Sequence, residues 1–314
     1  MSVDREKLLV LANSVIPDLH DEFYKGQCGR IGFIGGCMLY TGAPYFASIS
    51  SLKLGSDLVF VFCTASAAIP IKSYSPELIV IPILDSNDVE TSLPRYLQGL
   101  HALVIGPGLG KDDSLTKAIM IAVKTMRDSN KPILLDADSL YFVGKDFDLI
   151  RDYSKAILTP NAIEFSRVYK ILFGRDLSKE EMQSPRRQLE EVCKEIGSVT
   201  VVVKGRNDHI SDGQSLLICD DEGSSRRCGG QGDLLVGSLA NFAFWSSMAK
   251  NKSESHISRE GLNPFMIAAF AACTLTRKCN RLAFERFGRC MTTSDMIKEL
   301  PNAFASLFPF KLKS

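Results

Sequence analysis

Short apolar runs alternate with longer amphipathic segments along most of the chain. Continuous rather than alternating apolar runs predict strands buried on both faces of a sheet. They are Arg30–Gly36, Asp57–Cys63, Glu77–Ile83, His101–Gly106, Pro132–Ala137, Lys155–Thr159 and Val199–Lys204. Helical periodicity occurs between them, at Pro44–Leu54, Asp113–Asp128, Asn161–Ile171 and Pro185–Ile196. This alternation predicts βαβ units and an α/β fold, a three-layer αβα sandwich with a central, mostly parallel sheet.

The pattern changes after Lys204. The run HISDGQSLLICD (His209–Asp220) predicts a hairpin that turns at Asp212 and Gly213. We then expect helices at Gly232–Met248, Asn263–Phe287 and Ser294–Phe308, with a polar surface loop at Ala249–Pro264. There is no internal repeat or linker-like segment, so we expect residues 1–314 to form a single domain.

Composition narrows the functional classes. Hydrophobic residues make up 45% of the 314 residues and charged residues 23%, as in ordinary globular proteins. The net charge of +1 gives no overall field for nucleic acid or an anionic membrane, and we expect neither as a partner. No apolar run is long enough to span a bilayer.

Cysteine and histidine usage points to a reduced compartment without structural zinc. The nine cysteines include no C-x-x-C pair, which favours free thiols and a cytoplasmic location. The four histidines form no zinc-binding pattern. The first residues, MSVDREKLLVLANSVIPDL, predict an amphipathic helix and lack the features of a signal or transit peptide.

The stretch RRCGGQGDLLVGSLANFAFW (Arg226–Trp245) places glycines directly before an apolar helix. Unpaired amides and the helix dipole make such a position a candidate site for phosphate. Arg226 and Arg227 would suit a polyphosphate there. Asp233 either caps the helix or serves a bound ligand, although a cap needs no glycine cluster before it. The P-loop pattern is absent.

Three other stretches are ambiguous by themselves. The glycines of IGPGLGKD (Ile105–Asp112) either form a tight turn or let the backbone approach a ligand at the carboxyl ends of the strands. In LTPNAIEFSRV (Leu158–Val168), Glu164 and Arg167 share a helix face and could be a surface ion pair. Lys204 lies at a strand end, where it either meets a phosphate or is simply solvated.

Together these stretches resemble a known family. The order KGQCGRIGFIGG, YTGAPYFA, SPELIV, IGPGLG, LDADSL, LTPNAIEF, RRCGGQGD and RCMTTSDMI is similar to that of eukaryotic ATP-dependent NAD(P)H-hydrate dehydratases, and the match covers nearly the whole chain. The resemblance implies a ribokinase-like fold and the use of ATP with Mg²⁺. It implies repair of the S epimer of NADH hydrate and NADPH hydrate by phosphorylation and elimination. Metal ligands are not apparent, and whether the chain forms homo-oligomers stays open.

The resemblance also assigns roles to residues. Asp233 corresponds to the catalytic base, and the backbone at Gly230 and Gly232 would hold the transferred phosphoryl group. The hydrate-binding elements correspond to Gly108, Asn161, Ala162, Ile163, Glu164, Phe165, Ser166 and Arg167, with Asp233. The ATP-binding elements correspond to Lys204, Gly205, Arg206, Asn207, Asp208, Gly223, Ser224, Ser225, Arg226, Arg227, Cys228, Gly229, Gly230, Gln231 and Gly232.

Two rival functions remain at this point. A small-molecule kinase of the same fold, acting on a hydroxymethylpyrimidine, a thiazole alcohol or pyridoxal, typically has G-A-G-D or G-T-G-D where this chain has G-G-Q-G-D. A nucleotide sensor without turnover would not need Asp233. The chain departs from the common family pattern at Cys37, Met38 and the stretch GKDD (Gly110–Asp113), all outside the glycine loop.

Overall fold

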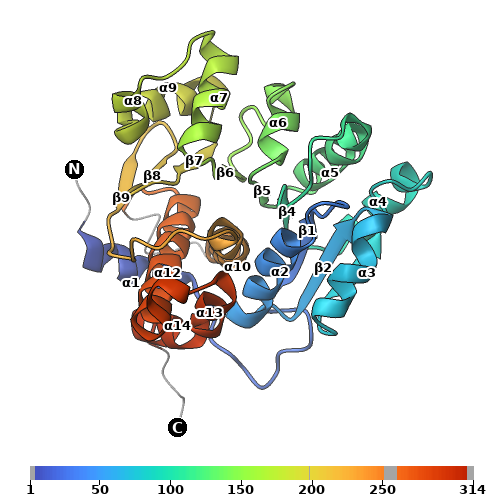
Figure 1. Cartoon of the computed structure of the whole chain (residues 1–314), viewed down its shortest axis with the longest axis horizontal. Helices are drawn as coiled ribbons and strands as arrows, with labels where there is room; N and C mark the ends of the chain where they lie inside the picture. The colour runs from blue at the N-terminus through green and yellow to red at the C-terminus, as the bar shows by residue number, and fades with distance from the viewer. Residues whose placement is uncertain (1–3, 198, 251–259, 310–314) are drawn as a thin grey trace.

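One continuous sheet runs through the part of the chain that the computed structural model describes, residues 4–197, 199–250 and 260–309 (Figure 1). Among these residues it has nine strands in the order β3-β2-β1-β4-β5-β6-β7-β8-β9. The strands are β1 (Arg30–Ile34), β2 (Leu58–Cys63), β3 (Ile79–Pro82), β4 (Ala102–Ile105), β5 (Ile133–Leu135), β6 (Ala156–Leu158), β7 (Thr200–Val203), β8 (Asp208–Ser211) and β9 (Leu216–Cys219).

The seven predicted strands are all present and all parallel, which confirms the mostly parallel sheet. The predicted hairpin adds β8 and β9 in antiparallel register at one end. It turns where expected, because the carboxylate of Asp212 accepts hydrogen bonds from the amides of Gln214 and Ser215.

Helices cover both faces of the sheet. One core contains α1 (Arg5–Val15), α2 (Gly42–Leu54), α3 (Ala65–Tyr74), α10 (Gln231–Lys250), α12 (Pro264–Phe287), α13 (Thr293–Lys298) and α14 (Leu300–Leu307). The other contains α4 (Val89–Gln98), α5 (Thr116–Asp128), α6 (Ser139–Val143), α7 (Ala162–Phe173) and α9 (Arg186–Ile196), with α8 (Lys179–Gln183) at its edge. Short 3₁₀ turns are η1 (Asp113–Leu115), η2 (Phe147–Leu149) and η3 (Gly288–Cys290).

The continuous apolar strands separate these two cores. Successive side chains of a strand point to opposite faces, so Val202 lies in one core while Val201 and Val203 lie in the other. The expected three-layer αβα sandwich is therefore confirmed.

Proline accounts for the main errors in the predicted helices. The single helix expected at Ser294–Phe308 is wrong: it divides into α13 and α14, with Pro301 in the first turn of α14. Proline cannot donate the backbone hydrogen bond that a continuous helix would need there. The helices α3 and α4 were not predicted, and each has a proline inside it, Pro70 and Pro94. The predicted loop at Ala249–Pro264 falls largely on residues 251–259, outside the described residues.

The packing of α10 on α2 fixes where α10 begins. A Cβ atom on Gly237 would lie 2.1 Å from the carbonyl oxygen of Ala47, so only glycine permits this approach. The first turn of α10 is thereby held near the ends of the central strands (Figure 1), where a Cβ on Gly232 would lie 3.4 Å from the Nζ of Lys204.

The substitution Gly237→Ala is expected to destabilise the fold, because α10 must move away from the backbone of α2. Overpacking of this kind costs about 1–3 kcal/mol, which lowers the Tm by roughly a few degrees. Thermal unfolding measures it. Gly99→Ala is the control, since Gly99 has helical backbone angles and its nearest neighbour to an added Cβ lies at 4.0 Å. Equal melting temperatures for both variants would contradict the prediction.

Candidate active site

The carboxyl ends of the parallel strands bring distant stretches of sequence together. Asp136 follows β5, Thr159 follows β6 and Lys204 follows β7. Lys204 Nζ donates to Asp136 Oδ1 at 2.6 Å, and Thr159 Oγ1 donates to the same oxygen at 2.7 Å. This edge of an open α/β sheet is where ligands bind in such folds.

The glycine loop reaches the same edge. Gly230 has a φ of +94°, and an added Cβ would lie 2.8 Å from Phe46 and 3.0 Å from Thr293. Thr293 Oγ1 anchors the loop by donating to the carbonyl oxygen of Gly229 at 2.6 Å. Among the described residues, the amides of residues 229–233 have no hydrogen-bond acceptor. Unpaired amides at the start of a helix are suited to bind an anion, so the predicted phosphate site stays a prediction that this geometry permits.

Asp233 lies in the first turn of α10, close enough to Asp136 and Lys204 for their charges to act on it. Burial, and then the carboxylate of Asp136, raise the pKa of Asp233 to about 7, while Lys204 opposes this shift. No hydrogen bond or ion pair engages this carboxyl within the described part of the chain. A carboxyl group with such a pKa is suited to accept a proton near neutral pH.

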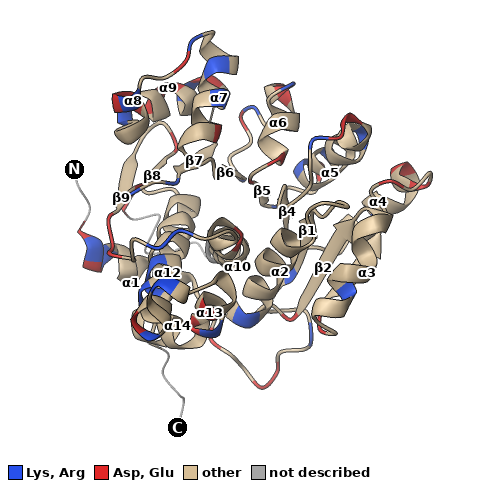
Figure 2. Cartoon of the chain, viewed as in Figure 1, with Lys and Arg blue, Asp and Glu red and all other residues tan. Residues whose placement is uncertain are grey.

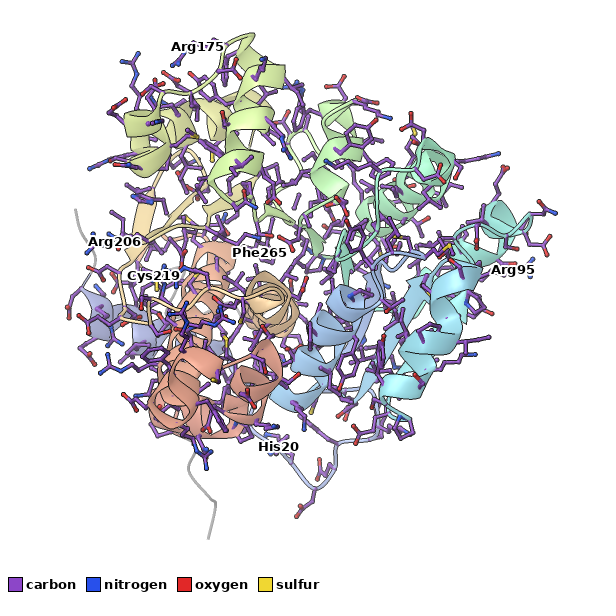
Figure 3. All side chains as sticks on the ribbon, in the orientation of Figure 1. His20, Arg95, Arg175, Arg206, Cys219 and Phe265 are labelled. Atoms are coloured by element: carbon purple, nitrogen blue, oxygen red, sulfur yellow. The ribbon has the colours of Figure 1, made fainter. Side chains whose placement is uncertain are left out.

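A cavity of about 550 Å³ lies beside the glycine loop. Its wall includes many of the residues predicted to bind ATP: Lys204, Gly205, Arg206, Asp208, Gly223, Ser224, Arg227, Cys228, Gln231 and Gly232. Asn161 joins them, since it forms an isolated bridge with Lys204. Figure 2 shows basic segments along the connection that leads into α10, and Figure 3 shows Arg206 on the β8–β9 side of the molecule. The volume and the charge suit a nucleotide with phosphates.

A smaller recess of about 100 Å³ lies next to α7. Glu164 and Arg167 line it together with Lys111, Asp138 and Tyr141. Glu164 is not paired with Arg167; its Oε2 accepts from the amide of Asn161 at 2.8 Å, within a capping box that starts α7. Burial raises the pKa of Glu164.

Comparison with known proteins identifies the family. Residues 31–302 match the family model described as NAD(P)H-hydrate dehydratase. The chain is 47% identical to the ATP-dependent (S)-NAD(P)H-hydrate dehydratase of Mus musculus, over 97% of this chain and 87% of that protein. It is also 47% identical to that of Homo sapiens, over 97% of this chain and 86% of that protein. The chain belongs to the NAD(P)H-hydrate dehydratase family.

Solved structures show the same fold. The ADP/ATP-dependent NAD(P)H-hydrate dehydratase of Bacillus subtilis, co-crystallised with ATP/Mg²⁺, superposes with a TM-score of 0.69 at 19% identity, over 94% of this chain and 96% of that one. A ribokinase from Giardia lamblia gives a TM-score of 0.61 at 12% identity, over 89% and 99%. The expected ribokinase-like fold is therefore confirmed.

Some of the residues predicted to bind ATP or the hydrate do not line either cavity. Asn207, Ser225, Arg226, Gly229 and Gly230 lie outside the wall of the larger one, and Gly108, Ala162, Ile163, Phe165 and Ser166 outside that of the smaller one. Asp233, which was also predicted to contact the hydrate, lines neither cavity. The side chain of Phe165 is fully buried in the core, so its predicted part in binding the hydrate stays a prediction about the segment that carries it. Gly108 stays partly exposed beside Tyr40, at a φ of +61°.

The sequence analysis did not predict the wall that α12 contributes to the larger cavity. Cys273, Thr276, Arg277 and Asn280 line the larger cavity. Arg277 pairs with Asp208 at 2.8 Å and donates to the carbonyl oxygen of Gly205 at 3.1 Å, so it supports the strand-end loop. Their spacing of three and four residues, where the apolar first half of α12 gives way to polar residues, is the signal that could have revealed this face.

No metal-binding cluster of three or more His, Cys, Asp or Glu residues occurs in the described ranges. Likewise, no described helix has the length and apolar character needed to cross a bilayer.

The substitution Asp233→Asn is expected to stabilise the protein at pH 8. The folded-state pKa of Asp233 is raised to about 7, above the unfolded value near 4. The folded protein therefore loses stability as pH rises between these values. Between pH 5 and 8, the Tm should fall less steeply with rising pH in the variant than in the wild type. An equal slope in both proteins would contradict the raised pKa of Asp233.

The substitution Gly230→Ala should weaken ATP binding more than Gly229→Ala does. Gly230 combines a positive φ with close neighbours, whereas an added Cβ on Gly229 would meet nothing within 4 Å. Displacement of the loop would lower the affinity at least about tenfold, or roughly 1.4 kcal/mol. Titration calorimetry with ATP and Mg²⁺ measures both variants, and equal affinities would refute this role of the loop.

Proposed function

We propose that this protein is an ATP-dependent (S)-NAD(P)H-hydrate dehydratase. It would convert the S epimers of NADH hydrate and NADPH hydrate back to NADH and NADPH, with ATP becoming ADP and phosphate. The observation that carries the proposal is the placement of Asp233, with a pKa of about 7, directly after unpaired amides at the start of α10. A base beside an anion site is what transfer of a phosphoryl group to an alcohol requires.

The nucleotide would occupy the larger cavity. Arg206, Arg227 and Lys204 supply positive charge on its wall, and the amides of residues 229–232 would bind the transferred phosphoryl group. Mg²⁺ would enter with ATP and offset the charge of the phosphates. Binding the developing negative charge with fixed amides lowers the barrier to transfer.

The hydrate would lie between this cavity and the recess at α7. Asp233 accepts the proton of the ring hydroxyl as that oxygen attacks the γ-phosphorus, and ADP leaves. The ring nitrogen then donates its lone pair and expels phosphate from the adjacent carbon. Loss of a proton from the neighbouring carbon restores the dihydropyridine. The sum is hydrate plus ATP giving NAD(P)H, ADP, phosphate and a proton.

We also propose the cytoplasm as the site of action. All nine cysteines are unpaired in the structure, and most are buried. Free thiols in this number are typical of proteins kept in a reducing compartment.

The direct test is recovery of reduced nicotinamide absorbance when the protein is mixed with S-NADH hydrate, ATP and Mg²⁺. Asp233→Asn should lower the rate about 100-fold or more, because the base is lost. Asp88→Asn is the matched control, an exposed acid at the start of α4. Free phosphate should form in step with NADH. Recovery without ATP, or full activity in Asp233→Asn, would reject the proposal.

The pH dependence offers a further test. Asp233 must be deprotonated to act, so kcat/KM should fall as pH drops below about 7 and level off above it. Steady-state assays from pH 5.5 to 9 measure this limb. A limb near pH 4 instead would mean that a group other than Asp233, or an unshifted Asp233, controls the rate.

A further inference from the structure

Asp136 is an almost fully buried carboxylate that the proposed mechanism does not use. Only 2% of the residue is exposed. Both of its described donors, Lys204 Nζ and Thr159 Oγ1, converge on Oδ1. A buried charge is retained only with such partners, so Asp136 and Lys204 depend on each other.

Lys204 stands at the centre of a group of carboxylates. The charges of Asp136, Glu164 and Asp233 all act on its ammonium group. Burial lowers the pKa of Lys204, but these carboxylates outweigh it and the pKa stays above its ordinary value. Lys204 is therefore a cation that is stabilised by several nearby carboxylates.

Of these carboxylates, Asp136 is the one that forms the ion pair with Lys204. The ammonium lies 2.6 Å from Asp136 Oδ1, whereas no ion pair within 4.0 Å joins it to Asp233 in the described part of the chain. It also lies against the glycine loop, 3.4 Å from where a Cβ on Gly232 would be. The lysine thus faces the phosphate site while the carboxyl of Asp233 stays unpaired.

We propose that Asp136 is a positioning residue that holds the Lys204 ammonium to itself, keeping it clear of Asp233 and turned toward bound phosphate. Without Asp136, Lys204 would pair with Asp233 instead. That pairing would stabilise the ionised carboxylate and make Asp233 a weaker base. The proposal deepens the proposed function, because it concerns the same base.

The charged groups around Asp233 come from several elements. Asp136 follows β5 and Lys204 follows β7, and both act on Asp233 directly. Glu164 in the first turn of α7 acts on Lys204, and Asp138 acts on Glu164. Arg206, Arg227 and Arg277 lie on the nucleotide side of the cavity. Asp136 and Lys204 are therefore the pair to vary.

The titration of Asp233 tests the proposal without any turnover. Carbon-13 NMR of labelled aspartate carboxyls follows it, with the signal assigned by its loss in Asp233→Asn. We expect Asp136→Asn to lower the midpoint by roughly half to one pH unit and Lys204→Met to raise it by a similar amount. Asp208→Asn is the control, because its buried carboxylate pairs with Arg277 instead, and it should leave the midpoint within about 0.2 units.

A double variant separates positioning from simple charge. If Asp136 acts through Lys204, the downward shift caused by Asp136→Asn should shrink at least about twofold in the Lys204→Met background. A shift of equal size in both backgrounds would mean that Asp136 acts only by its own charge, which overturns the proposal. An unmoved midpoint in folded Asp136→Asn overturns it too.

Measurements of turnover and thermal stability provide a second test of the proposal. Lys204→Met alone leaves the charge of Asp136 buried and should lower the Tm, and the added Asp136→Asn should restore much of it. Turnover of the hydrate should stay at least about tenfold low in the double variant, since the phosphate-facing cation is gone. Recovery of turnover along with the Tm would show a purely structural pair and overturn the proposal. A wild type without turnover rejects the proposed function, while the NMR titration still decides the role of Asp136.

Discussion

The close approach of α10 to α2 is the constraint on which the rest of the structure depends. It places the carbonyl oxygen of Ala47 where any side chain at Gly237 would have to be. The contact sets the position of α10 above the sheet, and so the position of its first turn relative to the strand ends. The anion site and the base are both properties of that first turn. The positions of both therefore depend on the packing of Gly237, about one turn further along the helix.

Electrostatics at this edge follow from the same placement. Bringing Asp233 next to Asp136 puts two carboxylates near one ammonium, that of Lys204. Asp136 forms the hydrogen bond with Lys204, and Asp233, which has no such partner, has a raised pKa. The arrangement resembles other sites in which paired titratable groups are driven apart in pKa and so acquire different roles. Here the parallel sheet creates the pair, because parallel strands end at a common edge.

Segments that lie well apart in the second half of the chain form the walls of the larger cavity. The loop after β7 and the glycine loop form one side, and α12 forms the other through Arg277 and its neighbours. Arg277 bonds to the carboxylate of Asp208 and to the carbonyl oxygen of Gly205, which ties the helix to the strand-end loop. The cavity therefore depends on the pairing of β8 with β7 as well as on the glycines.

The sequence by itself determined the layers and most of the elements. Strands that are apolar at every position predict a sheet covered on both faces. Glycines directly before an apolar helix predict a site that can bind an anion. The sequence-based prediction failed at prolines. Two helices that contain Pro70 and Pro94 were not predicted, and a helix predicted as continuous is divided near Pro301. Tertiary structure alone decided that Lys204 bonds to Asp136 rather than to Asp233. It also decided that Phe165 is core and that Arg277 belongs to the site. The bond of Lys204 joins residues far apart in the chain, and periodicity carries no information about such distances. The spacing of polar residues on α12 indicates a polar face, but it does not indicate which cavity that face lines.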